Sequence, residues 1–431
     1  MKAIATTVFI YFLFSYILEI KAQNPEWIVF YPWNSGLPAY SVTELAVDTL
    51  GNKWIGTGGF GEGGVAVYDD ENWTVYDTSN AFIWSYDNFI TALAVDKENN
   101  VWTATQFDGH PYKFNGINWQ AIATPGYSKI LDMEVDIYNR VWIGHEGGGV
   151  YVLIILCNDT IERVFTLNNS NIPSGEVTSI FFENEDTSKV WLGGAGHLMF
   201  FNGVSWIDFN DQNSGLPYNC TIYDVIVDQE GKKWLATDQG FIIFSEESWI
   251  IYTSQNSDLP EGIPYKLTLD ENNIIWLGLS SGGLVKIEGD IWTIYNTSNS
   301  PLPNNSVFSL ITDKLNNKWI GTMGGLAVHN EIGVQITGLP YDLLPVNEEL
   351  FIYPNPLSIK GTVKYNCLTP EDVFIGICDL KGNVIHTMIN QKLHKGLHVF
   401  ELNMSSFPAG FYLLKCISGD DVIIKKFLKY D

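Results

Sequence analysis

The sequence predicts an all-β protein: a seven-bladed β-propeller closed by its N-terminal strand, followed by a small Ig-like β-sandwich. Three observations predict this fold. A tryptophan-centred motif recurs seven times, the seventh copy lacks a strand that the N-terminus supplies, and the composition changes near residue 349. Aromatic residues make up 14% of the chain and glycines number 39, which is typical of short strands joined by tight turns.

The N-terminal segment, residues 1–22, reads as a secretory signal peptide. Lys2 gives a positive start, residues 4–18 form an uncharged apolar run, and Ala22 offers a small-residue cleavage point. A membrane-spanning helix needs about 20 apolar residues, so we expect export and not an anchor. The mature chain should therefore be secreted or displayed at the cell surface without spanning a membrane.

The repeat is set by tryptophans that stand 40 to 49 residues apart, which suits a propeller blade of four strands. They are Trp54, Trp102, Trp142, Trp191, Trp234, Trp276 and Trp319. An acid stands six residues before each one: Asp48, Asp96, Asp136, Glu185, Asp228, Asp270 and Asp313. We expect this acid to accept backbone N–H groups in a hairpin turn, and a calcium ligand is the alternative.

Two further positions repeat with the tryptophan. A turn-forming residue, usually Gly or Asn, stands three residues before it, and Gly or Ala stands two residues after it. The small residue shares the face of the tryptophan because side chains alternate along a strand. It should leave room for the neighbouring blade to approach closely.

The blade count follows from the outer strands. Trp319 is followed by a third strand at 326–329 but by no aromatic fourth strand. Residues 27–38 instead match 206–217, where an outer strand leads into Asn-Ser-Gly-Leu-Pro. We therefore predict that the first strand completes the seventh blade of a propeller spanning 23–332, which removes the open sheet edge.

The repeat resembles the two-component regulator propeller repeat, most clearly in Trp-Ile-Gly-Thr at 54–57 and 319–322. In that family such propellers often form the sensor half of hybrid histidine kinases that detect oligosaccharides. The present sequence shows no kinase or DNA-binding region. The resemblance therefore implies the capacity to bind a ligand and does not extend to signalling.

A linker at 333–349 leads to residues 350–431, where short strands and turns predict a small sandwich. This region resembles the type A C-terminal sorting domain of the type IX secretion system of Bacteroidetes. The motif residues are Tyr353, Pro354, Asn355, Pro356, Gly410, Tyr412, Lys425 and Lys426. The resemblance implies export through the type IX secretion machinery, and an ordinary binding sandwich is the alternative.

The charge is uneven along the chain. Residues 23–349 hold 13 Lys and Arg against 41 Asp and Glu, whereas residues 350–431 hold 9 against 7. So acidic a propeller argues against a nucleic-acid partner, because DNA and RNA binding needs basic residues. No zinc pattern or disulfide framework fits the five cysteines, so we assign no cofactor. Calcium and a bridge among Cys367, Cys378 and Cys416 stay open, and we expect a monomer.

Candidate ligand-binding residues lie on the loops that lead into each innermost strand. They are Tyr40, Trp84, Tyr86, Tyr127, Tyr218 and Tyr265. Aromatic rings among Asn, Ser and Asp suit a glycan, because the apolar faces of sugars stack on rings. A peptide ligand, or simple packing of the loops, is the alternative.

A catalytic interpretation rests on the Gly-rich loops after the tryptophan strands. His110, His145 and His197 lie at similar points of three blades, and Glu146 follows His145. A lyase acting on a polysaccharide or small molecule would use His145 and Glu146 as its proton-transfer groups. No nucleophile elbow, phosphate loop or HExxH motif occurs, so we favour a binding protein over an enzyme.

Overall fold

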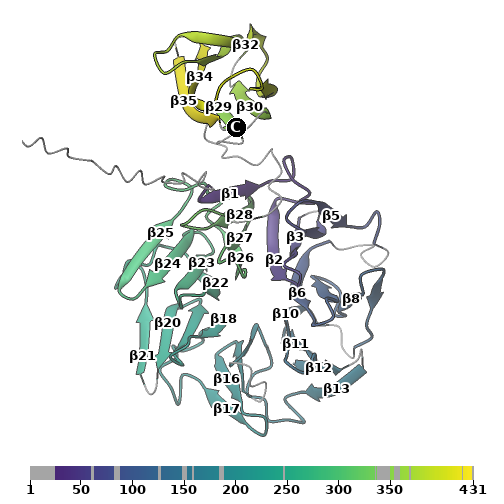
Figure 1. Ribbon diagram of the computed structural model, residues 1–431. Coiled ribbons are helices and arrows are strands. Elements are labelled where there is room, and N and C mark those ends of the chain that lie inside the picture. The colour runs from purple at the N-terminus through teal and green to yellow at the C-terminus, as the bar shows by residue number, and fades with distance from the viewer. Residues whose placement is uncertain are drawn as a thin grey trace, which may run out of the picture. The chain divides into compact units, whose positions relative to one another are not determined.

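The structure is a computed structural model that describes residues 25–59, 63–81, 88–124, 128–147, 153–157, 160–183, 189–245, 248–334, 336, 350–353, 360–367, 370–419 and 421–429. These residues form two compact units, one within Pro25–Val346 and one within Asn347–Asp431 (Figure 1). Both units consist of strands and turns. Across the described ranges there is no helix that is long and apolar enough to cross a bilayer.

The first unit is built from four-stranded antiparallel sheets whose strands mostly follow one another in the chain. The first sheet holds β2 (Ser41–Val47), β3 (Lys53–Gly58), β4 (Gly64–Tyr68) and β5 (Trp73–Tyr76). The second holds β6 (Ile90–Val95), β7 (Val101–Thr105), β8 (Tyr112–Phe114) and β9 (Trp119–Ala121). The third holds β10 (Ile130–Val135), β11 (Val141–His145), β12 (Leu153–Cys157) and β13 (Thr160–Phe165).

The remaining sheets of this unit repeat the pattern. The fourth holds β14 (Ser179–Phe182), β15 (Val190–Gly194), β16 (His197–Phe201) and β17 (Trp206–Phe209). The fifth holds β18 (Ile222–Val227), β19 (Lys233–Thr237), β20 (Gly240–Ser245) and β21 (Ser248–Tyr252). The sixth holds β22 (Pro264–Leu269), β23 (Ile275–Leu279), β24 (Leu284–Glu288) and β25 (Ile291–Tyr295).

The seventh sheet joins distant parts of the chain. It holds β26 (Val307–Thr312), β27 (Lys318–Thr322) and β28 (Gly325–His329), and its outer strand is β1 (Trp27–Phe30). β1 pairs antiparallel with β28, so Trp27 lies opposite His329 and Phe30 opposite Leu326.

The sheets follow one another around a common centre, to which the inner strands β2, β6, β10, β18, β22 and β26 lie nearest (Figure 1), and β14 has the same place in its sheet. Each of these inner strands contacts the inner strand of the next sheet, and β26 also contacts β2. The unit is therefore an all-β propeller, as the sequence predicts. The hydrophobic core is divided into clusters that lie between neighbouring sheets.

The Asp-initiated turns have the expected geometry. In the first sheet the Oδ1 atom of Asp48 accepts bonds of 2.9 Å from the backbone N–H groups of Leu50 and Asn52. Its Oδ2 atom accepts the indole N–H of Trp54 at 3.1 Å. The turn former has positive φ, as at Gly51 (91°) and Asn99 (63°), where glycine and asparagine are least strained.

The fourth sheet departs from the expected spacing. Trp191 donates its indole N–H to Glu183 at 2.8 Å, although the spacing in the other repeats points to Glu185. Glu185 itself lies outside the described residues. Glu183 stands eight residues before its tryptophan, which indicates a hairpin two residues longer than in the other sheets.

The small residue after each tryptophan serves close packing. A Cβ atom built on Gly278 would lie 2.5 Å from Val307 of the seventh sheet. One built on Gly321 would lie 2.7 Å from Val42 of the first sheet. These distances are too short for any side chain, so the neighbouring sheet occupies the space that glycine leaves.

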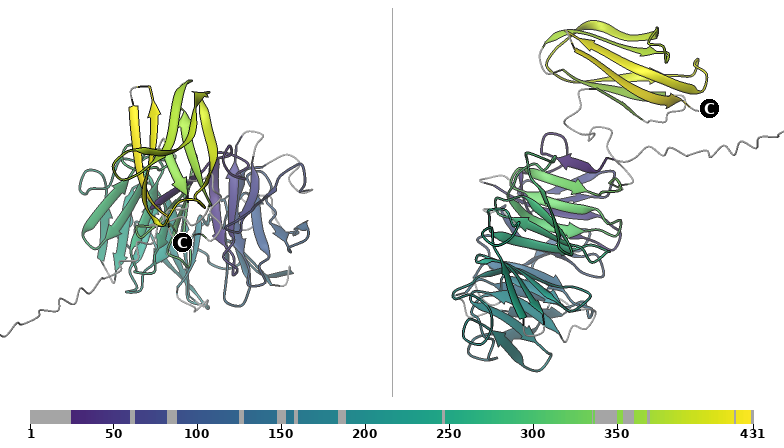
Figure 2. Two further views of the ribbon diagram at one scale, coloured as in Figure 1. Left: turned by 45° about the horizontal axis from the view of Figure 1, so that its top comes forward. Right: turned by 90° about the vertical axis from the view of Figure 1, so that its left-hand side faces the viewer.

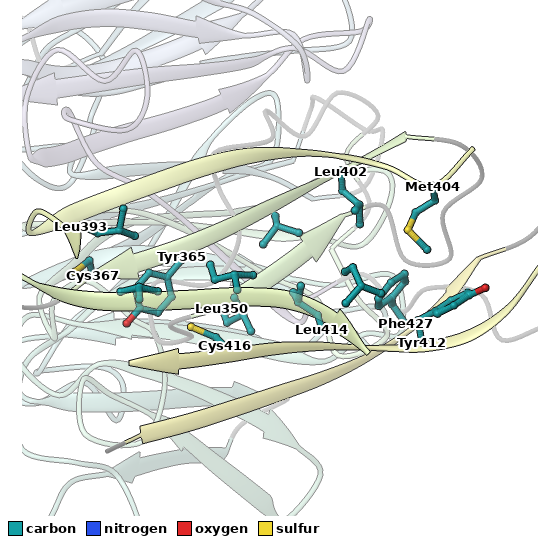
Figure 3. Packing of buried hydrophobic residues seen from close by; sticks show 14 residues of the cluster. Leu350, Tyr365, Cys367, Leu393, Leu402, Met404, Tyr412, Leu414, Cys416 and Phe427 are labelled. Atoms are coloured by element: carbon teal, nitrogen blue, oxygen red, sulfur yellow. The ribbon is translucent and has the colours of Figure 1, made fainter. Parts of the chain in front are cut away.

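The second unit is a sandwich of two antiparallel sheets (Figure 2). One sheet holds β29 (Leu350–Tyr353), β30 (Lys360–Cys367) and β33 (Gly396–Asn403). The other holds β31 (Glu371–Cys378), β32 (Val384–Leu393), β34 (Gly410–Ser418) and β35 (Asp421–Lys429). Figure 3 shows the shared core, to which Leu350 and Leu402 come from one sheet and Leu414 and Phe427 from the other.

Cysteines contribute to the two cores as apolar side chains. Cys220 in the first unit and Cys378 in the second are buried free thiols. Cys367 and Cys416 are buried in the second core, among its leucines and aromatic rings (Figure 3).

Candidate functional site

The inner strands of the propeller carry a repeated irregularity. In six sheets the register between the first and second strands shifts by one residue near the start of the inner strand, as between Val42 and Glu44. The extra residue is a β-bulge, which leaves the ladder and re-aims the neighbouring side chains. The bulged residues are Thr43, Thr91, Leu131, Tyr223, Tyr265 and Phe308.

Three of the bulged residues form an aromatic row. The ring centroids of Tyr223 and Tyr265 lie 5.2 Å apart, and those of Tyr265 and Phe308 lie 5.8 Å apart. All three side chains are half-buried. The inner strands of the fifth, sixth and seventh sheets therefore present a continuous wall of rings, whereas the first two sheets carry threonine at the same position.

The residue that directly follows each bulged residue is charged in several sheets. Glu44, Asp132, Asp224 and Lys266 occupy this position in the first, third, fifth and sixth sheets. Each is paired with the small residue that follows the sheet's tryptophan by two. Glu44 and Lys266 each feel the charges of the other three groups, so the four lie close enough to interact.

Electrostatics distinguish the members of this cluster. Burial raises the pKa of Glu44 to about 8, Asp132 and Asp224 add to the shift, and Lys266 opposes it. Burial alone would lower the pKa of Lys266, but the carboxylates of Asp224, Glu44 and Asp132 raise it above its usual value. The raised pKa of Glu44 favours its protonated, hydrogen-bond-donating form, and the neighbouring carboxylates keep Lys266 charged.

Two carboxylates of the cluster join neighbouring sheets. Asp132 accepts the backbone N–H of Ile180 at 2.7 Å, and Asp224 accepts that of Leu267 at 2.8 Å. Ser179 also donates its hydroxyl to Asp224 at 2.9 Å. Asp132 and Asp224 are therefore structural acceptors. Among the residues that the structure describes, no hydrogen bond or ion pair of the side chains of Glu44 or Lys266 is found.

Glu134 lies two residues after Asp132 and belongs to the same charged region. Its side chain is exposed to solvent. Solvent therefore reaches the inner strands at this level.

The structure separates the predicted ligand-binding residues into three groups. Tyr265 belongs to the aromatic row. Tyr40 and Tyr218 are exposed and precede the inner strands β2 and β18. Trp84, Tyr86 and Tyr127 lie outside the described residues.

The predicted catalytic pair is not arranged as a proton-transfer pair. His145 ends β11, is fully buried, and its Nδ1 atom lies 3.2 Å from both Oγ and the carbonyl oxygen of Ser128. Burial lowers the pKa of His145, so the ring is neutral. Glu146 is exposed. His197 is bound separately to Asp208 at 2.8 Å, and His110 to Thr124 at 3.2 Å.

Sequence analysis missed Glu44, Asp132, Glu134, Asp224 and Lys266. A usable signal exists, because Glu44, Asp132, Asp224 and Lys266 each stand ten residues before the tryptophan of their repeat. A charge that recurs at one fixed position of the inner strand is therefore visible in the repeat itself. Among the described residues no group of three or more His, Cys, Asp and Glu side chains is arranged to hold a metal ion.

The sorting motif is partly described. Tyr412 is buried and donates its hydroxyl to the carbonyl oxygen of Pro408 at 2.7 Å, and Gly410 begins β34. Lys425 and Lys426 lie on β35, where the ammonium group of Lys426 stands 4.0 Å over the ring of Phe411. The backbone of Tyr353 ends β29. Pro354, Asn355 and Pro356 lie outside the described residues.

Comparisons with known proteins assign the second unit. Residues 351–430 match the family described as secretion system C-terminal sorting domain. A comparison with curated protein sequences found no match.

Comparison with solved structures supports the propeller. The chain is similar to PorZ, a surface component of the type IX secretion system of Porphyromonas gingivalis, at 17% identity and a TM-score of 0.54, over 92% of this chain and 60% of that one. It is also similar to the extracellular domain of the BT4673 system of B. thetaiotaomicron, at 15% identity and a TM-score of 0.53, over 94% and 59%.

A third similar structure is a streptogramin B lyase, at 13% identity and a TM-score of 0.56, over 69% of this chain and 95% of that one. The chain thus spans about 60% of the length of PorZ and of the BT4673 domain. At these identities the similarity concerns the fold and carries no activity.

Proposed function

We propose that this chain, whose residues 351–430 belong to the secretion system C-terminal sorting domain family, is exported by type IX secretion and presents a glycan-binding propeller outside the cell. In this proposal the signal peptide at 1–22 is removed, and residues 23–332 form one ring of seven blades closed by β1. A linker at 333–349 joins the ring to the sorting domain at 350–431. The protein acts as a binding module and not as an enzyme.

The observation that carries the proposal is the aromatic row of Tyr223, Tyr265 and Phe308 beside Glu44 and Lys266. Half-buried rings offer flat apolar surface for a sugar face. The protonated carboxyl of Glu44 and the ammonium group of Lys266 offer donors for ring and hydroxyl oxygens. A few polar groups converging beside apolar surface are typical of small-ligand sites.

The other interpretations have less support. A lyase that uses His145 and Glu146 would need both groups to reach the substrate, and His145 is fully buried. A peptide ligand would use the same rings. The aromatic row covers only three inner strands, which is a short surface for an extended peptide. We therefore take a peptide as an outcome of the binding experiment and not as a second proposal.

Glycan binding is tested by screening the full chain on a glycan array and measuring the affinity for each hit by calorimetry. Tyr265→Ala should weaken binding at least tenfold, because stacking on one ring contributes about 1–3 kcal/mol. The matched control is Tyr138→Ala. Tyr138 is exposed on the turn that follows the inner strand β10, at the end opposite to the bulge of that strand. Equal affinity in both variants, or peptide hits alone, would contradict the proposal.

Export is tested by expressing the chain in a bacterium with a type IX system, with and without residues 350–431. The full chain should reach the medium or the outer surface, whereas the truncated chain should accumulate in the periplasm. Resistance of the truncated propeller to protease serves as the folding control. Equal amounts of both forms outside the cell would show that export does not depend on the sorting domain.

A further inference from the structure

A hollow lies between the fifth and sixth sheets, separate from the inner strands and their aromatic row. Its volume is about 240 Å³, and its wall includes the rings of Trp234, Tyr252 and Trp292 and the carboxylates of Asp258 and Asp290. Trp234 and Tyr252 come from the fifth sheet, and Trp292 comes from β25 of the sixth. Asp258 comes from the loop that connects the two sheets.

The connecting loop is one copy of a repeated element, Asn-Ser-x-Leu-Pro, found at 34–38, 213–217, 256–260 and 299–303. Each copy is held by the same bonds. In the copy at 256–260, Asn256 accepts the backbone N–H of Thr253 at 2.8 Å, and Ser257 donates its hydroxyl to the carbonyl oxygen of Thr253 at 2.7 Å. The buried Leu259 anchors the loop. Its backbone is therefore fixed by its own sequence.

The variable position of this element holds Gly36, Gly215, Asp258 and Pro301 in the four copies. A Cβ atom built on Gly36 would lie 2.3 Å from Cβ of Trp73, and one built on Gly215 would lie 2.3 Å from Cγ of Trp249. In these two copies, the loop between two sheets lies directly against the tryptophan on the outer strand of the second sheet. At the equivalent position Asp258 carries a side chain, and this residue lines the hollow together with Trp292.

The chemistry of the hollow favours a cation. Asp258 and Asp290 are exposed, and within the described ranges neither carboxylate makes a hydrogen bond or ion pair. Of the described residues that line the space, none is a lysine or arginine. Aromatic faces attract cations through their quadrupole, and carboxylates bind them by charge-assisted hydrogen bonds. The side chains of Asn256 and Ser257 are engaged within the loop, so they offer little to a neutral sugar.

We propose that this hollow binds the cationic head of a small organic ligand, a primary ammonium or guanidinium group on a short apolar stem. The stem lies against Trp292 and Tyr252, and the head pairs with Asp258 and Asp290. The net charge of −25 draws such cations toward the protein. This proposal does not rest on the proposed glycan site, which lies on the inner strands.

The test is titration of the full chain with n-butylammonium chloride, followed by calorimetry or NMR. n-Butanol provides the neutral counterpart of the same shape, and glucose provides a sugar. We expect millimolar binding of the ammonium ion, at least tenfold weaker binding of n-butanol and glucose, and loss of affinity as salt rises. Binding of n-butanol as tight as that of the ammonium ion, or a preference for glucose, would overturn the proposal.

Two variants locate the site. Asp258→Gly removes one of the two carboxylates and introduces the residue found at Gly36 and Gly215, so it should weaken binding at least tenfold. Asp290→Asn should weaken it about fivefold, which is the loss of one exposed charge pair. Glu271→Gln is the control because it removes an exposed charge of the same sheet outside the hollow. If Asp258→Gly misfolds, Asp290→Asn measured against Glu271→Gln decides alone, and equal affinity in these two would refute the site.

Discussion

The two units of the molecule contain the same five-residue turn, and they use it differently. Asp48-Thr49-Leu50-Gly51-Asn52 and Asp379-Leu380-Lys381-Gly382-Asn383 share their hydrogen bonds. In both, the first carboxylate accepts two backbone N–H groups at 2.9 Å and the amide group of the last residue. The glycine has positive φ in both, 91° and 86°. The local sequence alone therefore produces the turn.

The difference lies six residues after the aspartate. In the propeller Trp54 donates its indole N–H to Asp48, and both side chains are buried. In the sorting domain that position is Ile385, which is exposed, and Asp379 lies in solvent. The same turn is thus a surface connection in one unit and part of the core in the other. The burial of the indole decides which of the two it becomes.

The largest effect expected from this comparison is the loss of the buried aspartate. Asp48→Ala leaves the indole N–H of Trp54 and two backbone N–H groups without their acceptor in a buried place. We expect a loss of about 3 kcal/mol in the free energy of unfolding. All 15 tryptophans lie in 27–319, so tryptophan fluorescence in a urea titration reports the propeller alone.

Asp379→Ala is the matched variant, and it should leave the sorting domain nearly as stable as before because water replaces the lost acceptor. Hydrogen exchange of residues 370–419 measures this unit in the full chain. Similar destabilisation by the two variants would mean that burial of the indole adds nothing to the turn.

The sequence predicts the turns, the tryptophans and the small residues because each stands at a fixed offset in a repeat that recurs along the chain. The bond between Trp191 and Glu183 was missed, since a fixed offset cannot detect a hairpin that is two residues longer. The charged cluster was missed for a different reason. Glu44 and Lys266 are 222 positions apart, and only the arrangement of the sheets brings their charges together. Asp258 stands where two other copies of the repeated loop have glycine, at Gly36 and Gly215. Only the structure shows that it lines a hollow together with Trp292.

A second difference between the units is their response to acid. His329 in the propeller is buried, its ring stacks on Trp27 of β1 at 4.2 Å, and burial lowers its pKa to about 4. In the unfolded chain the pKa is near 6.5, so the unfolded state binds the proton first as pH falls. The contribution of His329 should therefore fall by about 3 kcal/mol between pH 6.5 and 4. The raised pKa of Glu44 acts in the opposite direction over this range, so the contribution of His329 is measured as the difference between the parent chain and a His329 variant.

His329→Gln should flatten this part of the pH profile, and urea titrations at several pH values measure it. The sorting domain provides the internal control, because His386 and His394 are exposed there. Since His329 packs on β1, an unchanged acid slope in the variant would place the titrating group elsewhere and would weaken the case that this joint closes the ring.

The smallest effect concerns the glycines, which serve different purposes in the two units. Gly278→Ala in the propeller should cost about 2 kcal/mol, because the added Cβ atom would lie 2.5 Å from Val307 and must push the next sheet away. Gly382→Ala in the sorting domain meets no atom within 4 Å and should cost about 1 kcal/mol, through its positive φ alone.

Asparagine separates these two causes. Gly382→Asn should restore most of the stability lost in Gly382→Ala, because asparagine tolerates positive φ, as Asn99 and Asn139 do in the equivalent turns of the propeller. Gly278→Asn should be worse than Gly278→Ala, because a larger side chain meets the same sheet. If asparagine rescued position 278, or failed to rescue position 382, backbone strain and close packing would have been assigned to the wrong units.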